Sequence, residues 1–290
     1  MPLWKPNDLS DLKLWLRGKD LETSLADGAN ITTWADQSGN NHHLVAGSSP
    51  NFEAGISNNK GGAKFTSSSS TAGEFLVCND ADGPMDVGTG NFYFGIFCAS
   101  AESTTGVQSI VAHDKQNDSF DIRHNGSKFV RHVGAISMLD SVSVTDGDLH
   151  YVTVEKRDTN TLASHINGGA DIGTSTSFTT NISDDEFLLG KRDDTDIKAF
   201  DGKIIEVICY HTEISTSEKD LISGYVTHQW DKESLLGNGH STGATHKYKS
   251  GPPTACHCVA ETTLSTTALS SNPRNPAQLS ENLNIFDERR

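Results

Sequence analysis

The residues best able to do chemistry in this sequence are carboxylates, because Asp and Glu number 38 against 23 Lys and Arg and 12 His. Enzymes that cleave glycosidic bonds need two carboxyl groups, roughly 5–9 Å apart, that flank the bond. The spacing E-x-D-x-x-E, which would supply carboxylates from one strand, does not occur, and neither does a P-loop. We therefore expect a protein that is not an enzyme.

Two acidic stretches have the composition of calcium-binding loops. NDADGPMD contains three aspartates around a glycine, and KRDDTD contains three more. Oxygen ligands on loops suit Ca²⁺, although neither stretch has the glutamate that completes an EF-hand. Solvated acidic loops are the alternative interpretation. The candidate calcium ligands are Asp80, Asp82, Asp86, Asp193, Asp194 and Asp196.

Three further motifs have both a structural and a functional interpretation. In WADQSGNNHH, Asp36 either closes a turn by bonding nearby amides or serves as a ligand. In FDGKIIEV, a regular strand would place Asp201 and Glu206 on opposite faces, so Glu206 is interpreted as a structural charge bonded to backbone or arginine. The stretch from Cys256 to Cys258 lacks the second pair of ligands that a zinc site requires.

The charge balance limits the partners. The formal net charge is −15, and a surface of that sign repels phosphate backbones and anionic lipids, so we expect no nucleic-acid binding and no membrane insertion. No apolar run approaches the roughly 18–20 residues that span a bilayer. The opening stretch MPLWKPNDLSDLKLWL lacks the basic start and apolar run of a signal peptide. Cys78, Cys98 and Cys209 stand in apolar runs, which favours buried thiols and a reducing compartment.

The pattern over most of the chain is that of an all-β protein. Short apolar or alternating runs recur between Gly, Asn, Asp and Ser residues, which is typical of a sandwich or barrel. The expected strands are Leu12–Leu16, Ile31–Trp34, Ala63–Thr66, Phe75–Cys78, Asn91–Ala99, Gln108–His113, Phe120–His124, Lys128–Val133, Leu149–Lys156, Leu162–Ile166, Phe187–Leu189 and Lys203–His211.

One helix is expected, over residues 216–232, and it should dock on the sandwich. Ser215 and Glu218 form a capping box, and the apolar residues that follow recur on one side of a helix. After residue 253, Ser, Thr and Pro are frequent and the periodicity ends. We therefore expect a domain over residues 1–253 and an extended arm over residues 254–290 that becomes ordered against a partner.

These motifs follow one another in an order that resembles a known family. LKLWLRGKD precedes ITTWADQSGNNHHL, GGAKFT, DLHYVTVEKRDTNTLASHINGG, LLGKRDD, FDGKIIEVICYHTEISTSEKDLISGYVTHQW and GHSTGATHKYKSGPP. The sequence resembles the concanavalin A-like, or laminin G-like, jelly-roll domains that end in a helix with a Y-x-x-x-[KQ]-W motif and a Y-K-S-x-P-P tail. The resemblance covers residues 10–253. It implies a concanavalin A-like jelly-roll sandwich with one C-terminal amphipathic helix.

The opening pattern W-x-P-x-x-L-x-x-L-x-L-W-L resembles the start of such domains in virion proteins of tailed, particularly marine, phages. The resemblance implies a non-enzymatic surface protein of a phage particle, either a capsid decoration protein or a tail or head fibre. Such a protein is assembled in the host cytoplasm and needs no export signal. Its implied partners are other virion proteins, as a homo-oligomer or as capsid or tail neighbours held through residues 254–290.

Two other functions remain open, because this fold supports many activities. A carbohydrate-binding, lectin-like module would bind host-surface glycans through aromatic residues, alone or within a virion protein. A glycan-cleaving enzyme is disfavoured by the missing carboxylate pattern. No cofactor is expected apart from Ca²⁺. The candidate glycan contacts are Trp4, Tyr93, Tyr151 and Tyr248.

Overall fold

The computed structural model describes most of the chain up to residue 254, in one unit that spans residues 1–255. The described residues are 3–69, 72–79, 83–99, 106–113, 120–125, 128–133, 136–139, 147–158, 160–169, 171, 173–175, 182, 186–192, 198–237 and 245–254. Apart from residue 254, the expected C-terminal arm lies outside the described residues, so its role stays a prediction.

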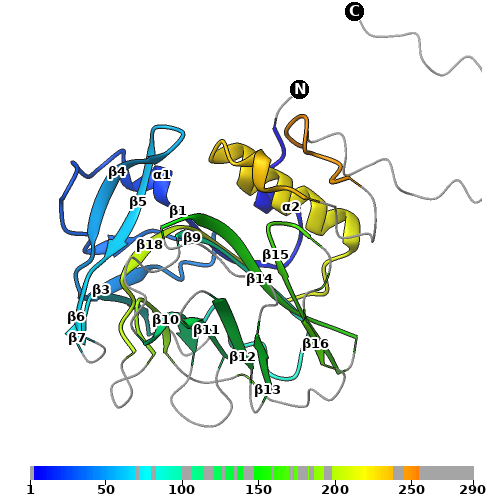
Figure 1. Ribbon diagram of the computed structural model, residues 1–290, viewed down its shortest axis with the longest axis horizontal. Coiled ribbons are helices and arrows are strands. Elements are labelled where there is room, and N and C mark those ends of the chain that lie inside the picture. Colours follow the sequence, from blue (N-terminus) through cyan, green and yellow to red (C-terminus); the bar gives the residue numbers. More distant parts are fainter. Residues whose placement is uncertain are drawn as a thin grey trace, which may run out of the picture. The chain divides into compact units, whose positions relative to one another are not determined.

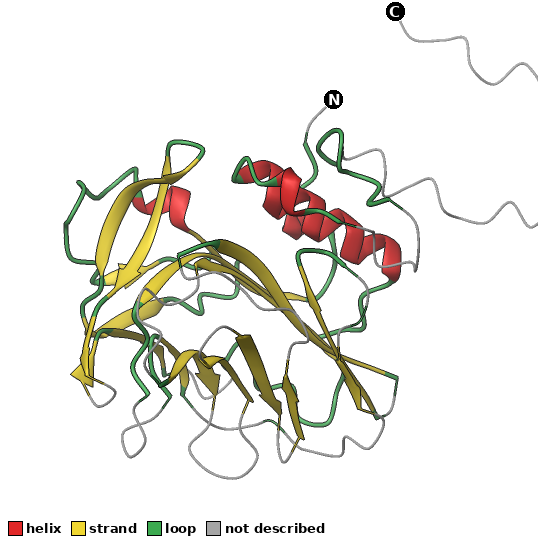
Figure 2. Ribbon diagram, viewed as in Figure 1, coloured by secondary structure: helices red, strands yellow, loops and turns green. Residues whose placement is uncertain are grey.

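Two antiparallel sheets form this unit (Figures 1 and 2). The first sheet has the order β16-β15-β14-β9-β18-β5-β4, and β1 also pairs with β18. Its strands are β1 (Leu12–Arg17), β4 (Asn51–Ser57), β5 (Lys60–Phe65), β9 (Phe92–Ala99), β14 (Leu149–Arg157), β15 (Thr161–Ile166), β16 (Gly173–Ser175) and β18 (Gly202–Tyr210).

The second sheet has the order β13-β12-β11-β10-β17-β8-β3-β2. Its strands are β2 (Thr33–Trp34), β3 (Leu44–Ser48), β8 (Phe75–Cys78), β10 (Val107–His113), β11 (Phe120–Asn125), β12 (Lys128–Val133), β13 (Ile136–Leu139) and β17 (Phe187–Leu189). A separate short pair joins β6 (Ser67–Ser69) to β7 (Ala72–Gly73). The helical elements are η1 (Pro6–Asp8), α1 (Gly18–Leu21), α2 (Thr216–Gln229) and η2 (Glu233–Leu235).

The all-β sandwich expected from the sequence is confirmed. Every expected strand occurs, with ends that differ by three residues or fewer. The sequence pattern does not predict β3 and β4, because LVAGS and NFEAGIS mix apolar residues with Gly, Ser and Asn. Both are nevertheless paired, β3 with β8 and β4 with β5, so their neighbours rather than their own composition hold them in place.

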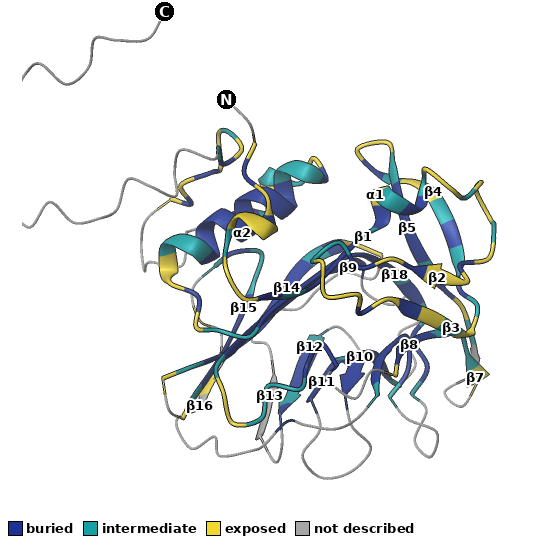
Figure 3. Cartoon of the chain, turned by 180° about the vertical axis from the view of Figure 1, so that it is seen from behind, coloured by how far each residue is buried: buried dark blue, intermediate teal, exposed yellow. Residues whose placement is uncertain are grey.

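The central strands of the first sheet, β9, β14 and β18, are almost entirely buried on both faces (Figure 3). All eight residues of β9 are buried, and in β14 Val152 and Val154 face the space between the sheets while Tyr151 faces the other way. We call the cluster on that other face, beneath α2, the helix-side core. Its buried members are Trp4, Leu12, Trp15, Tyr93, Phe97, Ala99, Leu149, Tyr151, Ile205, Ile208, Tyr210, Ile214, Leu221, Ile222, Tyr225, Val226, Trp230 and Tyr248.

A β-bulge in β18 decides which side chains enter the helix-side core. The pairing of β18 with β9 skips one residue between Ile204 and Glu206. Ile204 and Val207 therefore face the space between the sheets, while Ile205 and Glu206 both face the helix side. A regular strand would direct Glu206 into the apolar space between the sheets, so the bulge is what lets β18 carry a carboxylate.

Helix α2 begins and docks as the sequence predicts. The Ser215 hydroxyl accepts a hydrogen bond from the Glu218 amide at 3.3 Å, and the Glu218 carboxylate accepts one from the Ser215 amide at 2.8 Å. These two bonds form the capping box. The helix ends at Gln229, three residues before the expected end, with Trp230 as its C-cap. Leu221, Ile222, Tyr225 and Val226 of the helix all lie in the helix-side core.

The two ends of the described chain lie together beside α2. Leu3 forms an antiparallel β-bridge with Thr254, and the Trp4 amide donates to the Pro253 carbonyl at 3.2 Å. The N-terminal segment and the Pro252–Pro253 tail therefore border the same side of the helix. No helix among the described residues has the length and apolar character needed to cross a membrane.

We predict that Trp230→Ala lowers the free energy of unfolding by about 3–5 kcal/mol, which is typical of removing a fully buried tryptophan. The Trp230 ring is completely buried, and its Nε1 donates to Glu206 Oε2 at 2.6 Å. Urea unfolding followed by circular dichroism measures the loss. Trp230→Phe keeps an aromatic ring but not the N–H donor, so it should lose less. An alanine variant as stable as the original chain would show that α2 contributes little to the fold.

Candidate functional site

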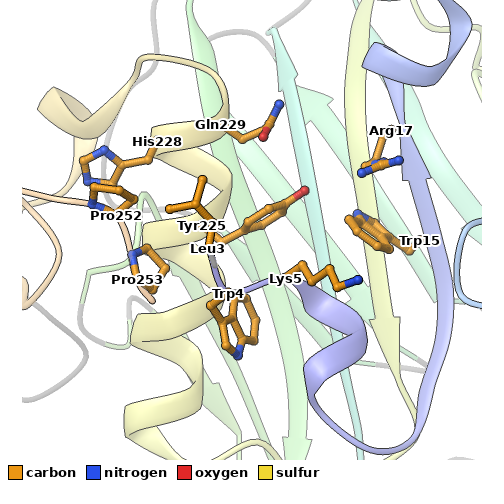
Figure 4. A pocket seen from close by; sticks show the side chains of 10 residues that line it. All are labelled: Leu3, Trp4, Lys5, Trp15, Arg17, Tyr225, His228, Gln229, Pro252 and Pro253. Carbon is orange, nitrogen blue, oxygen red and sulfur yellow. The ribbon is translucent and has the colours of Figure 1, made fainter. Parts of the chain in front are cut away.

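A cavity lies where the N-terminal segment, β1, the end of α2 and the Pro252–Pro253 tail meet (Figure 4). Its volume is about 300 Å³, at the lower end of the range for small-molecule sites. It is therefore large enough for one small ligand unit. The residues that line the cavity are Leu3, Trp4, Lys5, Trp15, Arg17, Tyr225, His228, Gln229, Pro252 and Pro253.

Three aromatic side chains from three separate segments form the inner wall of the cavity. The Tyr225 ring lies edge-on to Trp4 and to Trp15, with ring centroids 5.9 and 6.0 Å apart and interplanar angles of 71° in both cases. Alternation along β1 points Trp15 and Arg17 to the helix side. Only 1–8% of each aromatic residue is exposed, so the rings present edges and small patches to the cavity.

Beneath this wall lies the buried carboxylate of Glu206. Its Oε1 accepts a hydrogen bond from Trp15 Nε1 at 2.9 Å, and its Oε2 accepts one from Trp230 Nε1 at 2.6 Å. The Tyr225 hydroxyl is a third hydrogen-bond partner. Burial raises the pKa of Glu206, and these hydrogen bonds oppose that rise. The structural role expected for Glu206 is confirmed, but its hydrogen-bond partners are two indoles and a phenol rather than backbone or arginine.

Polar groups stand at the mouth of the cavity. The Arg17 guanidinium lies over the Trp15 ring, 4.5 Å from its centroid, and donates to Asp20 from Nε at 2.8 Å and from Nη2 at 2.7 Å. Burial alone would lower the Arg17 pKa, but the hydrogen bond and charge of Asp20 raise it. Lys5 is exposed, and Gln229 is half-buried. His228 Nε2 donates a hydrogen bond to the Tyr248 carbonyl at 2.6 Å, which fixes the ring.

The sequence did not identify this cavity as a site. Of its lining residues, only Trp4 is among the predicted glycan contacts. The alternation in LKLWLR could have shown that Trp15 and Arg17 share a face, and the YKSGPP tail could have pointed to Pro252 and Pro253. These residues meet only because the N-terminal segment, β1, the end of α2 and the tail pack together, and no local sequence pattern predicts that packing.

The other predicted glycan contacts lie inside the protein. Tyr93, Tyr151 and Tyr248 are 0%, 1% and 3% exposed, and all three belong to the helix-side core. The Tyr93 and Tyr151 hydroxyls lie 3.2 Å apart between the sheet and the helix. A buried ring cannot stack on a sugar, so the expectation that these tyrosines form an exposed contact surface is wrong. The reason is the second core, which places aromatic residues beneath α2.

The predicted calcium ligands are mostly not placed. Asp80, Asp82, Asp193, Asp194 and Asp196 lie outside the described residues, as do Cys256 and Cys258. Asp86 is described, and its Oδ1 lies 3.1 Å from His113 Nε2 while its Oδ2 accepts a hydrogen bond from the Gly83 amide. A calcium site at these two loops therefore stays a prediction.

Asp36 has the structural role, because both of its oxygens are used within its own turn and by β1. Its Oδ1 accepts hydrogen bonds from the amides of Trp15 and Ser38, each at 2.9 Å. Its Oδ2 accepts from the Ser38 hydroxyl at 2.6 Å and from the His42 amide at 3.2 Å. The carboxylate thus ties the turn after β2 to β1.

A second polar cluster joins the sheet to the first half of α2. Glu155, His165 and Asp171 bring one possible metal-binding atom each within 4.8 Å of one another. Glu155 Oε1 already lies 2.8 Å from Lys219 Nζ, 3.0 Å from His165 Nε2 and 3.2 Å from Arg157 Nη1. Arg157 also pairs with Asp171. Because two carboxylates here face two permanent cations, we interpret the cluster as a charge network rather than a metal site.

The pKa of Glu155 is lowered by its neighbours in this network. Burial alone would raise the pKa, but the hydrogen bond and charge of His165, together with the Lys219 ammonium, outweigh burial and hold the value at about 2. Glu155 is only 1% exposed, so water screens these interactions weakly. The network therefore favours the ionised carboxylate.

No family model matches the sequence, and no curated protein matches it. Among solved structures, the binding domain of Paraclostridial Mosquitocidal Protein 1 is similar with a TM-score of 0.56 and 12% identity, over 76% of this chain and 53% of that chain. A botulinum neurotoxin type C structure, described by the dependence of cell entry on two ganglioside molecules, has a TM-score of 0.53, 12% identity and coverages of 75% and 51%.

A mutant sialidase of Trypanosoma rangeli that displays trans-sialidase activity is similar with a TM-score of 0.50 and 13% identity, over 72% of this chain and 32% of that chain. The chain thus spans about half, or less, of the length of these proteins. The chain shares their β-sandwich fold. At this level of identity the likeness concerns the fold alone.

We predict that Glu155 makes the stability of the protein depend on pH in the acid range. Its folded pKa of about 2 lies below the ordinary 4.5, so its contribution is present above pH 4.5 and is lost as the pH falls toward 2. The difference corresponds to roughly 3 kcal/mol. Denaturant unfolding at a series of pH values measures the dependence.

Glu155→Gln should be less stable than the original chain at pH 7, because it leaves the Lys219 ammonium without its carboxylate. It should also lose much less stability between pH 5 and pH 2. Glu213→Gln, at an exposed position, serves as the control and should keep the original pH dependence. Equal acid slopes for the original chain and Glu155→Gln would contradict the prediction.

Proposed function

We propose that this protein is a non-enzymatic carbohydrate-binding domain displayed on the surface of a phage particle. The observation that supports the binding function best is the cavity at the end of α2, which combines apolar walls with polar groups at its mouth. Sugars have an apolar C–H face and a polar rim of hydroxyls, so a site of this composition suits them. Its volume fits a single sugar unit at the end of a longer glycan.

The similar structures are consistent with a binding function, and they do not bear on display by a phage particle. The botulinum neurotoxin type C structure is described by an interaction with gangliosides, which are glycolipids. The Paraclostridial protein domain is described as a binding domain. Both descriptions concern chains of which the matched β-sandwich is about half, so they support a binding function here only by analogy.

The absence of catalysis is supported by where the carboxylates lie. Among the residues that line the cavity, all of them described, there is no carboxylate. Glu206, the nearest buried one beneath the wall, is closed off by Trp15, Tyr225 and Trp230. A general acid and base must reach the scissile bond, and neither role is open to a carboxylate sealed in this way.

The proposal that the domain is displayed on a virion is supported by the sequence. The opening pattern and the order of motifs resemble those of phage virion proteins, and residues 254–290 are proposed to hold the domain on a neighbouring protein of the particle. In that arrangement the sandwich is the exposed part, and its cavity would meet glycans on the host surface. Mass spectrometry of purified particles tests this part, because an absent chain would rule it out.

We predict that the purified chain binds a subset of glycans on an array and that Gln229→Ala weakens this binding at least about fivefold. Gln229 is the last residue of α2. Among the described residues, no partner forms a hydrogen bond with its side-chain amide, which is therefore open to a ligand. Alanine is a good helix former, so the substitution removes a polar group from the cavity without harming the helix. The array identifies the glycans, and isothermal titration of the best one gives the affinities.

Gln37→Ala is the matched control for this test. Gln37 is also half-buried but lies in the turn after β2 and does not line the cavity. It should bind as the original chain does. If no glycan binds, or if both variants bind as well as the original chain, the cavity is not a carbohydrate site.

We also predict that no glycan is cleaved. Incubation of the chain with the glycans it binds, and with laminarin and agarose, should release no reducing sugar above background. Release of sugar that a single carboxylate substitution abolishes would overturn the non-enzymatic part of the proposal.

A further inference from the structure

Apart from the Tyr225 phenol, whose pKa burial raises well above its ordinary value, the ionisable side chains that line the cavity at the end of α2 are all bases. They are Lys5, Arg17 and His228, in a chain whose acids outnumber its lysines and arginines by 38 to 23. Three bases and no carboxylate is the opposite of the balance over the whole sequence. The charge of the cavity lining therefore differs in sign from the charge of the protein.

The acids that balance these bases stand behind them. Asp20 holds the Arg17 guanidinium but does not line the cavity, and Glu206 lies beneath the aromatic wall. A ligand in the cavity thus meets the cations before it meets the carboxylates. Coulomb interactions fall with distance and are weaker across water, so the nearer groups decide the local potential.

Lys5 is the cation best placed to reach a ligand. Its side chain is exposed, and within the described parts of the chain no carboxylate lies within ion-pair distance of its ammonium. Its backbone is nevertheless fixed, because its amide donates to Asp8 Oδ2 at 2.9 Å and the neighbouring Trp4 amide donates to Pro253. The side chain therefore starts from a fixed point beside the cavity, and its ammonium keeps its donors for a ligand.

Arg17 supplies a second charge in a fixed position. Asp20 takes up its Nε and Nη2 donors, and the guanidinium plane lies over the Trp15 ring. Figure 4 shows Arg17 and Lys5 on the same side of the cavity, with Tyr225 and Gln229 between them and the tail prolines. One side of the cavity thus carries the two cations, and the opposite side carries the apolar Leu3, Pro252 and Pro253 with His228 beside them.

We infer that the cavity binds an anionic sugar, whose carboxylate or sulfate group is held by Lys5 with support from Arg17 while the apolar face of the ring lies toward the proline wall. This inference rests on the proposed carbohydrate-binding function and names its ligand class. A charge-assisted hydrogen bond from an ammonium is about twice as strong as a neutral one, which gives the anionic sugar its preference over a neutral sugar.

The test measures binding of three groups of oligosaccharides of equal length, which carry hexuronate, sulfated or neutral terminal residues. The original chain should bind at least one anionic group about tenfold more tightly than the neutral group. Lys5→Glu should bring that anionic group to the level of the neutral one or below. Lys5→Arg keeps the charge and should retain most of the preference.

Lys249→Glu is the matched control, because Lys249 is exposed and does not line the cavity. The substitution changes the net charge by the same amount as Lys5→Glu. It should bind as the original chain does. An equal loss in Lys249→Glu would overturn the inference, since the effect would then arise from net charge. Thermal unfolding of each variant confirms that it is folded.

The remaining outcomes separate this inference from the proposed function. Equal binding of neutral and anionic sugars, weakened in both cases by Gln229→Ala, leaves the carbohydrate site in place and refutes the preference for anions. Absence of binding to all three groups refutes both. A preference for hexuronates or for sulfated sugars alone supports the inference and identifies which anion the cavity takes.

Discussion

The burial of one carboxylate, Glu206, sets the constraints for the helix-covered half of this protein. A carboxylate removed from water must find hydrogen-bond donors, because an unpaired buried charge costs several kcal/mol. Here the three donors come from two elements: Trp15 on β1, and Tyr225 and the C-cap Trp230 of α2. The bulge in β18 turns Glu206 toward them. Strand, bulge, helix and helix cap are thus mutually dependent, and the cavity wall is built from the same aromatic residues.

The two halves of helix α2 make different kinds of contact with the rest of the domain. Its first half is held by polar contacts, in which Lys219 reaches Glu155 and Ser223 lies 2.9 Å from His246 Nε2. Its second half is held by the aromatic rings around Tyr225 and Trp230. Apolar packing tolerates sliding, whereas directed polar contacts fix a single register. The contacts of Lys219 and Ser223 in the first half therefore fix the register of α2 together with the hydrogen bonds to Glu206 in the second half, and with it the shape of the cavity.

The sequence predicted the sandwich because its signals are local. Alternation and turn residues mark strands such as β14, and a capping box marks the start of α2, so both could be placed within a few residues. The sequence failed where the outcome depends on a partner element. Strand β3 has a short apolar start and ends in Gly and Ser, and Tyr93 and Tyr151 look available until α2 covers them. Alternation alone also gives no warning of the bulge before Glu206.

The same limit applies to the site. Most of the chain separates Lys5 and Trp15 from Gln229 and Pro253, and each of these residues is unremarkable in its own stretch. Polar residues within one turn, such as Asp36 and Ser38, were interpreted correctly because their hydrogen bonds are local. A cavity that forms among distant segments needs the tertiary structure before its residues can be named.

The bridge between Leu3 and Thr254 has a mechanical consequence. In an antiparallel pair, the chain before Leu3 and the chain after Thr254 leave from the same end of the bridge. A force that pulls Leu3 and Thr254 apart would break the hydrogen bonds between the N-terminal segment and the tail one after another. It would not load many bonds at the same time. Leu3, Trp4, Pro252 and Pro253, which are also cavity-lining residues, would separate first, while the sheets behind them carried little of the load. The cavity is thus the part of the described domain most sensitive to traction on its two ends.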